Sequence, residues 1–434
     1  MDTIKTKNAF ILNFLKLYNL LWWLCLPFLK KHRRLKPGFK RRVSTHHLSK
    51  ADIWIQAASA GEAYLAVNII KKLHFKTLTQ VLVTTITSQG MDILKQNLEN
   101  RKTGYDADQQ LKLQIEWFPF DSPKIMKKAV KQINPKLMVL LETELWPALL
   151  YYLTMNQTKT MIVNARLSHS SFKHYRQTRF LWKHLAPDHI LATSTQDKNR
   201  YARIFETSLV QTMPNIKFEA FDNKALDTDV RRKIKKILPD HLPLTILASV
   251  RKEEETIIFK MVQTLLNEFP DQVVAIFPRH MHRIKAWTKM LARGQHHFET
   301  RSTLTSLLKG PGIILWDTFG ELKTAYGLAR VVFVGGSLKP LGGQNFIEPA
   351  MQGATTIIGP YYDDFVWVTE QIFSQNIVIK KQTQAAVCTA ILSALKNPVP
   401  RSDQIKRCSD FIHSKRGGTA HACQEIKKVF DRPL

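Results

Sequence analysis

The sequence predicts an α/β protein with two Rossmann-like halves that follow an N-terminal membrane-associated helix. Two observations predict the halves. Short apolar, strand-like runs alternate with longer amphipathic stretches from about residue 50, and a second series of the same kind starts near residue 244. The third observation is the apolar stretch AFILNFLKLYNLLWWLCLPFL at residues 9–29. With 434 residues, the chain is long enough for two domains with full apolar cores.

The N-terminal segment is long enough to span a bilayer, but Asn13, Lys16, Asn19 and Pro27 interrupt it. Spanning the membrane and lying in its interface are therefore both open. The following stretch KKHRRLKPGFKRR contains eight Lys and Arg residues, which predicts that everything downstream stays on the cytoplasmic side. A buried helix with a basic tail in solvent is the alternative. We predict that residues 1–43 form a membrane anchor and its basic flank.

The strand-like runs fall into two series. The first contains DIWIQAA, QVLVTTI, LQIEWFP, KLMVLLE, TMIVNA and HILATS, and the second contains PLTILASV, VVAIFP, GIILWD, VVFVGG and TTIIGP. We predict an N-terminal domain over residues 44–212, a C-terminal domain over 213–412 and a closing helix over 413–434. Two such sheets offer a cleft between their carboxyl edges, where two substrates can meet.

The formal net charge of +29 requires a polyanionic partner, which can be nucleic acid, an anionic membrane or a phosphorylated substrate. Residues 1–50 contain twelve Lys and Arg residues and one acid, so part of this charge flanks the apolar segment. The four cysteines form no CxxC pair and have no His partner at metal-ligand spacing. The acidic stretches DTD and YYDDF are weak metal signals, and helix capping explains the first. We predict neither a metal nor a cofactor.

Glu62 stands where a strand gives way to a helix. Residues 52–69 read DIWIQAASAGEAYLAVNI, an apolar run followed by small residues and then a helix-forming stretch. This order places Glu62 in a first helical turn at the carboxyl edge of a sheet, where open α/β folds bind ligands. The alternative is an acid that only complements the helix dipole. At that position, we expect the dipole to keep Glu62 ionised.

The stretch LLETELWP at residues 140–147 places Glu142 and Glu144 at the end of an apolar strand. Since the two acids are two residues apart, both would face the same side of a strand. They can then bind hydroxyl groups or orient Arg166 in NARLS, or they can point harmlessly outward.

The glycine-rich stretch GGSLKPLGGQNFIEPA at residues 335–350 follows the strand VVFV. Gly342 and Gly343 would let backbone N–H groups approach a phosphate, and the following helix would direct its positive end to the same place. Asn345 and Glu348 lie three residues apart, and Glu348 can accept hydrogen bonds from ribose hydroxyls. A tight turn that binds nothing is the alternative.

Two further strand ends carry polar residues. Arg279 and His280 in PRHMHR directly follow VVAIFP and suit a phosphate or carboxylate clamp. Thr318 and the backbone around Gly320 in DTFGEL follow GIILW and can bind an anion at the next helix. A solvated loop and ordinary helix capping are the respective alternatives.

In this order, SAGE, WFPFDSP, ETELWP, NARLS, NIKF, PRH, DTFGEL, GGSL, GGQNFIEPA and IIGP resemble the 3-deoxy-D-manno-octulosonic acid (Kdo) transferases. The resemblance covers roughly residues 15 to 400. It implies two Rossmann-like domains of the GT-B type and transfer of Kdo from CMP-Kdo to a lipid A precursor at the cytoplasmic face of the inner membrane. It also implies inverting, metal-independent chemistry.

The resemblance also implies roles for single residues. Glu62 matches the general base of the family, and Glu142 and Lys217 match acceptor-side residues. On the CMP side, the matching residues are Arg279, His280, the DTFGEL turn, Asn345 and Glu348.

Three positions depart from the family pattern. Gln344 replaces a His in GGHN, Tyr361 replaces the His of GPHxxNF, and Pro214 replaces the Gly before the Asn of GN-x-K. The ERxG pattern expected before the first strand is not visible in VSTHHLSK.

The expected partners are CMP-Kdo, a lipid A precursor and the anionic inner membrane, with no nucleic acid. A different membrane-associated GT-B glycosyltransferase that uses a UDP- or ADP-sugar is one alternative, and competition with CMP would distinguish it. A basic nucleic-acid-binding protein is another, and it predicts binding that survives removal of residues 1–43. A lipid scaffold would show no turnover.

Overall fold

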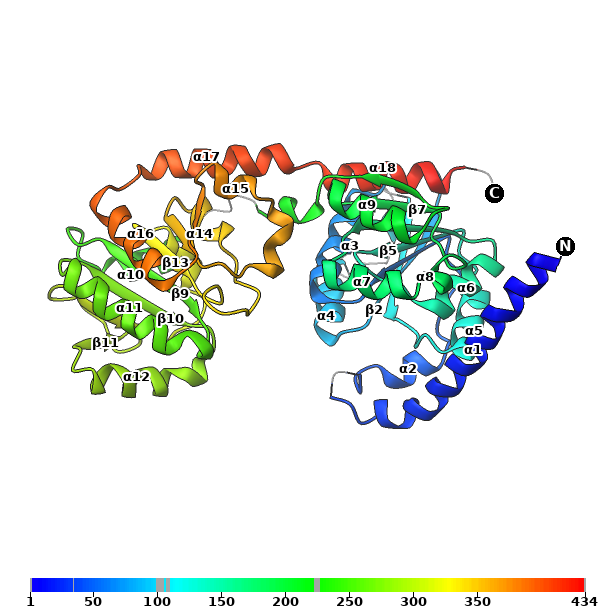
Figure 1. The fold of residues 1–434 in the computed structure, drawn as a ribbon, viewed down its shortest axis with the longest axis horizontal. Coiled ribbons are helices and arrows are strands. Elements are labelled where there is room, and N and C mark those ends of the chain that lie inside the picture. The colour runs from blue at the N-terminus through cyan, green and yellow to red at the C-terminus, as the bar shows by residue number, and fades with distance from the viewer. Residues whose placement is uncertain (1, 34, 99–104, 107–109, 222–226, 433–434) are drawn as a thin grey trace. The chain divides into compact units, whose positions relative to one another are not determined.

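A computed structural model describes residues 2–33, 35–98, 105–106, 110–221 and 227–432. The chain forms two compact units, one of residues Met1–Ala220 with Lys415–Leu434 and one of residues Phe221–Ser414 (Figure 1). The first unit extends beyond the predicted boundary at residue 212, because the short helix η1 (Ile216–Ala220) packs against helix α18 (Gly418–Phe430). Helix α18 returns from the C-terminal end of the chain to the N-terminal unit.

The N-terminal unit is built on a sheet with the strand order β3-β4-β2-β1-β5-β6-β7-β8. All neighbours that are described pair in parallel except β3 and β4. The strands are β1 (Ile53–Ala57), β2 (Thr79–Thr85), β3 (Tyr105–Asp106), β4 (Leu111–Trp117), β5 (Leu137–Leu141), β6 (Lys159–Ala165), β7 (His189–Ala192) and β8 (Leu209–Thr212).

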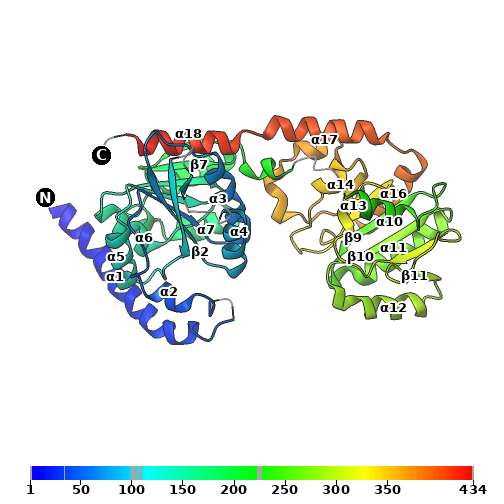
Figure 2. The ribbon, with the colours of Figure 1, turned by 180° about the vertical axis from the view of Figure 1, so that it is seen from behind.

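Helices cover both faces of this sheet, as in a doubly wound fold (Figures 1 and 2). They are α1 (Asp2–Leu29), α2 (Phe39–Val43), α3 (Ala60–Lys72), α4 (Ser88–Leu98), α5 (Pro123–Ile133), α6 (Pro147–Met155), α7 (His169–Gln177), α8 (Arg179–Trp182) and α9 (Thr195–Ile204), together with α18, which packs on β5 and β6. One core contains Ile53, Ile55 and Ile69, and the core on the other face contains Trp54 and Met138. Adjacent residues of β1 thus point to opposite faces, as the period of two requires.

Helix α1 lies beside α5 along the N-terminal unit (Figures 1 and 2). Ile11 and Leu15 are buried in the core of this unit. On the opposite side of the helix, many large apolar side chains are exposed, among them Leu17, Leu20, Leu24 and Phe28. In the described part of the chain, Phe10–Leu29 is one helical segment long and apolar enough to cross a membrane.

The C-terminal unit has a parallel sheet with the order β11-β12-β10-β9-β13-β14-β15. Its strands are β9 (Leu244–Val250), β10 (Val273–Pro278), β11 (Phe298–Thr300), β12 (Gly312–Leu315), β13 (Val331–Val334), β14 (Thr355–Ile358) and β15 (Val378–Lys380). From β9 the chain first adds strands toward one edge of the sheet (β10, then β12) and later toward the other edge (β13, β14 and β15). This reversal of the strand order at β9 is typical of a Rossmann-like sheet.

The helices of this unit are α10 (Thr228–Lys235), α11 (Glu255–Glu268), α12 (Ile284–Arg293), α13 (Leu322–Tyr326), α14 (Ile347–Met351), α15 (Gln371–Ser374), α16 (Gln384–Lys396) and α17 (Arg401–Lys415), with short turns η2 (Lys252–Glu254), η3 (Met281–Arg283) and η4 (Asp363–Val368). The predicted α/β fold with two Rossmann-like units and an apolar N-terminal helix is confirmed.

Candidate active site

Glu62 lies in the first turn of α3, directly after β1, as the sequence predicts. Its carboxylate accepts hydrogen bonds from the backbone N–H of Ala58 at 2.7 Å and from the Ser59 hydroxyl at 3.0 Å. In return, the Ser59 hydroxyl caps the helix by accepting from the Glu62 N–H at 3.3 Å. Ser59 and Glu62 have the spacing of a capping box, but the Glu62 carboxylate accepts from the N–H of Ala58, one residue before the N-cap, instead of from that of Ser59. Together these hydrogen bonds fix the orientation of the carboxylate.

Glu142 begins the loop that follows β5, because the strand ends at Leu141. The prediction that Glu142 and Glu144 share one face of a strand is therefore wrong. Glu142 adopts a left-handed conformation with φ 57°, which turns the chain out of the sheet. Its side chain forms an ion pair with Lys217 from η1, with 2.6 Å between Nζ and Oε1. Glu142 and Lys217, predicted from two separate motifs, thus meet.

Glu144 accepts a hydrogen bond from the indole N–H of Trp146 at 2.7 Å. Burial, followed by the charge of Glu62, raises the pKa of Glu144 to about 8. Burial and then the charge of Glu142 raise the pKa of Glu62 to about 7. The expectation that the helix dipole keeps Glu62 ionised is wrong near neutral pH, because desolvation and the like charge of Glu142 raise its pKa. We call Glu62, Glu142 and Glu144 the acidic edge.

Arg166 follows β6 and lies at the same edge of the sheet, but no hydrogen bond or ion pair of its guanidinium is found among the described residues. Its backbone carbonyl accepts from the hydroxyls of Thr143 and Tyr201. The neighbouring Asn164 has a role that the sequence did not indicate. Its side-chain oxygen accepts from the Ile216 N–H at 2.9 Å and so holds η1, which carries Lys217. In the sequence, the motif NARLS, which begins with Asn164, is the signal that could have pointed to this residue.

The predicted glycine-rich loop of the C-terminal unit needs its glycines. Gly342 and Gly343 have φ values of 85° and 79°. A Cβ at Gly343 would come within 3.0 Å of the Tyr362 backbone. Glu254, which the sequence analysis missed, is fully buried and accepts from the N–H groups of Gly336 at 2.5 Å and Leu338 at 2.7 Å. Its carboxylate therefore holds the first part of this loop.

Asn345 and Glu348 meet as their spacing suggests. The Asn345 amide donates to Glu348 Oε1 at 2.9 Å, and its oxygen accepts from the Ile347 N–H at the start of α14. Burial raises the pKa of Glu348, and Lys323 and Asn345 act against this shift. We call Gly336, Gly342, Gly343, Asn345 and Glu348 the glycine edge. It can bind an anion through the backbone and hydroxyls through one carboxylate.

Arg279 and His280 are exposed at the end of β10, as predicted. Slight burial, followed by the charges of Arg279 and Arg251, lowers the pKa of His280. Thr318 and Gly320 lie in the loop after β12. The Thr318 hydroxyl donates to Glu321 at 2.7 Å, and Glu321 also binds Arg301 and the Trp316 indole. Gly320 has a φ of 84°. Thr318 therefore supports the loop structure, beside the exposed side chain of Phe319.

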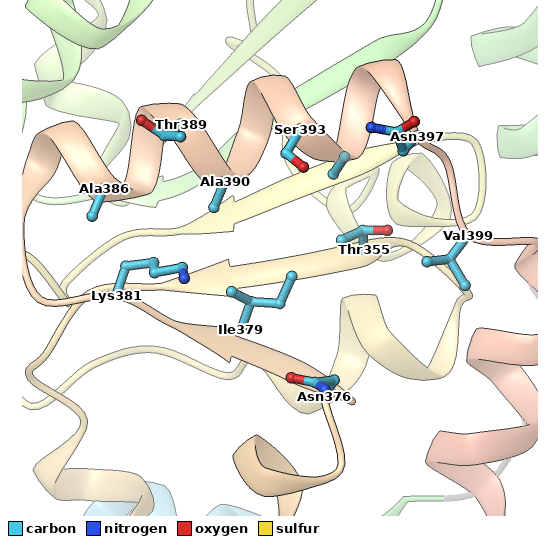
Figure 3. A pocket seen from close by; sticks show the side chains of 11 residues that line it. Thr355, Asn376, Ile379, Lys381, Ala386, Thr389, Ala390, Ser393, Asn397 and Val399 are labelled. Atoms are coloured by element: carbon cyan, nitrogen blue, oxygen red, sulfur yellow. The ribbon is translucent and has the colours of Figure 1, made fainter.

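One pocket of about 640 Å³ lies between helix α16 and strands β14 and β15 (Figure 3). Lys381, Thr389 and Ser393 are among its polar lining residues, and none of the predicted site residues lines it. The candidate residues of each unit thus lie at strand ends and in loops rather than in this pocket. Within the part of the chain that the structure describes, no group of three or more His, Cys, Asp or Glu side chains could hold a metal ion.

Comparisons with known proteins agree with these motifs. Residues 32–220 match the family model for 3-deoxy-D-manno-octulosonic-acid transferase (kdotransferase). A Kdo transferase of Haemophilus influenzae is 26% identical over 388 residues, which cover 88% of this chain and 87% of that protein.

A bifunctional glycosyltransferase/methyltransferase of Fusobacterium nucleatum is 28% identical over 374 residues. The match covers 83% of this chain but 56% of that longer protein. The crystal structure of a glycosyltransferase from Rickettsia africae matches with a TM-score of 0.58 at 11% identity, over 88% of this chain and all of that chain, which supports the fold alone. The chain is thus similar to the Kdo transferase family of glycosyltransferases over most of its length.

Proposed function

We propose that the protein transfers Kdo from CMP-Kdo to a lipid A precursor in lipopolysaccharide biosynthesis, with inversion and with Glu62 as the general base. The observation that carries this proposal is the placement of Glu62. Its carboxylate is fixed by Ala58 and Ser59 and lies near the ion pair of Glu142 and Lys217. The family resemblance supplies the substrates, and the chemistry of the residues supplies the roles.

The acceptor hydroxyl must lose a proton as it attacks the anomeric carbon of Kdo. A base is most effective when its pKa lies near the working pH, and the raised pKa of Glu62, about 7, meets this condition. Lys217 and Glu142 offer a cation and an anion for polar groups of the acceptor. Arg166, on the next strand end, is the third acceptor residue that we propose.

The donor is doubly anionic, since Kdo carries a carboxylate and CMP a phosphate. Arg279, His280 and the backbone around Gly320, Gly342 and Gly343 can bind these charges. Asn345 and Glu348 can bind the ribose hydroxyls. As the bond to CMP breaks, negative charge grows on the phosphate, and fixed N–H dipoles can stabilise it where no metal ion takes part.

We infer that helix α1 lies in the membrane interface rather than crossing the bilayer. Its inner side packs in the core through Ile11 and Leu15, while its outer side exposes apolar residues such as Leu20 and Phe28. A helix held along a soluble unit in this way can bury its outer side in lipid without leaving the protein. The basic flank favours the cytoplasmic face and anionic lipids.

The test is incubation of the purified full-length chain with CMP-Kdo and a tetraacylated, bisphosphorylated lipid A precursor. Release of CMP and a mass gain of the acceptor in whole Kdo units are expected. Glu62→Ala should abolish turnover and leave CMP binding intact, because the donor residues lie in the other unit. Asp229→Asn, a first-turn acid on the exposed helix α10, is the matched control and should retain activity. Full turnover in Glu62→Ala would contradict the proposed role of Glu62.

A further inference from the structure

Asp121 is a fully buried carboxylate that joins three parts of the N-terminal unit. It follows β4 in the motif WFPFDSP. Its Oδ1 accepts from the Leu149 N–H at 2.8 Å, and its Oδ2 accepts from the Ala148 N–H and from the Tyr18 hydroxyl, both at 3.1 Å. Tyr18 belongs to α1, while Ala148 and Leu149 open α6. One side chain therefore connects the N-terminal helix with the segment that follows the acidic edge.

Helix α6 depends on this carboxylate at its start. The N-cap residue Trp146 makes no capping hydrogen bond with its side chain, and Pro147 has no N–H to donate. The next two N–H groups, of Ala148 and Leu149, are buried and have Asp121 as their acceptor. Unpaired N–H groups at a helix start are costly, so Asp121 determines where α6 begins.

The loop of residues 142–146 connects the sheet with α6. At its beginning, the Glu142 N–H donates to the Val163 carbonyl at 3.0 Å. At its end, the Trp146 indole donates to Glu144, and its ring contacts Phe118 at a centroid distance of 5.4 Å. The start of α6 therefore sets the position of Trp146, and Trp146 in turn sets the position of Glu144.

The other end of the connection lies on α1. Next to Tyr18, the Asn19 side chain accepts from the Lys124 N–H at 3.3 Å. One turn further along α1, Trp22 contacts the ring of Phe120, the residue before Asp121, at 5.5 Å. Residues 118–124 thus contact α1 on one side and the 142–146 loop on the other.

We propose that Asp121 is a positioning residue that couples the docking of α1 to the geometry of the acidic edge. Helix α1 then supports the acceptor site in addition to holding the chain at a membrane. The consequence for acceptor binding rests on the proposed function, but the coupling between α1 and the 142–146 loop does not.

The test compares the full-length chain with Tyr18→Phe, which removes one hydroxyl from α1 and retains the ring. The first readout, amide hydrogen exchange, requires no substrate. We expect exchange of the amides at 144–149 to become about three- to tenfold faster in Tyr18→Phe, as the loss of one buried hydrogen bond gives. Amides of the C-terminal unit should not change. Unchanged exchange at 144–149 would overturn the proposal.

The second readout separates positioning from simple loss of stability. With detergent-dispersed acceptor, Tyr18→Phe should raise the KM for acceptor about three- to tenfold, while the KM for CMP-Kdo stays within twofold. Asp121→Asn should act in the same direction, and the double variant should be less than additive, because both changes break one connection. Equal changes in both KM values, or additive effects, would contradict the coupling.

Leu20→Ser on the exposed side of α1 is the control. It should weaken binding to anionic vesicles while leaving exchange at 144–149 and both KM values with dispersed acceptor unchanged. If Leu20→Ser accelerated exchange at 144–149 as much as Tyr18→Phe does, general loosening of α1 would explain the effect, and the role of Asp121 would be refuted.

If the wild type failed to use CMP-Kdo, the proposed function would fail, and hydrogen exchange would still decide the coupling.

Discussion

The acidic edge and the glycine edge occupy the same position in two similar sheets, but they are built from different groups. The acidic edge presents side-chain carboxylates that are largely buried, and two of them have strongly raised pKa values. The glycine edge presents backbone groups at left-handed residues and one side-chain carboxylate, Glu348. The first arrangement suits removal of a proton, and the second suits binding of an anion. A shared fold thus carries two chemistries through its strand ends.

The largest expected effect that sharpens this comparison is at the glycine edge. Gly343→Ala places a Cβ 3.0 Å from the Cα atom of Tyr362 and 3.2 Å from the carbonyl oxygen of Tyr361, at a φ of 79°. We expect the affinity for CMP to fall about 30- to 100-fold, since both the strained conformation and the displaced loop cost binding energy. Isothermal titration of CMP measures this. Gly310→Ala, where a Cβ would meet no atom within 4 Å, is the control and should bind normally. Equal affinities would show that the loop does not contact the donor.

The next effect concerns the ion pair of the acidic edge. Lys217→Met leaves Glu142 partly buried without its cation. We expect about a tenfold higher KM for the acceptor and unchanged affinity for CMP, because a charged group that binds substrate contributes energy of this order. Initial rates over a range of acceptor concentrations measure the change. A change confined to CMP affinity would remove Lys217 from the acceptor side.

The last expected effect is a change in stability rather than in substrate binding. The pKa of Glu62 is raised from 4.5 to about 7, so the stabilising protonated form is present below pH 4.5 and lost as the pH rises through 7. Glu62→Gln should therefore be more stable than the wild type at pH 8, by up to about 3 kcal/mol, and the difference should shrink toward pH 5.

Thermal unfolding of the wild type and Glu62→Gln at pH 5 and pH 8 measures this difference. A Tm rise of a few degrees at pH 8 alone is the expected result. An equal or larger gain at pH 5 would mean that ionisation of Glu62 does not destabilise the fold.

Local patterns predicted the main strands and the position of Glu62, because a buried strand, small residues and a helix start follow one another within ten residues. The short edge strands β8, β11 and β15 were not predicted, because most of their residues are not buried and they therefore lack the apolar run that marks the central four-residue strands. The return of α18 to the first unit also has no local signal.

The connections within the site were beyond local patterns. Tyr18 and Asp121 are 103 residues apart in sequence, and Asp121 and Leu149 are 28 apart. The role of Glu254 depends on a contact with Gly336, 82 residues later. The direction of the Glu62 pKa was misjudged because burial and the neighbouring carboxylate are properties of the fold, whereas the helix dipole is visible in the sequence.

The central claim, that Glu62 is the general base, is tested most directly by the pH dependence of kcat/KM for the acceptor in the wild type and in Glu62→Gln. This profile reports ionisations of the free enzyme. We predict a rise with a midpoint near pH 7 in the wild type and a residual activity in Glu62→Gln that is about 100-fold or more lower and lacks this rise. The same rise near pH 7 in both proteins would contradict the claim and would assign the ionisation to another group.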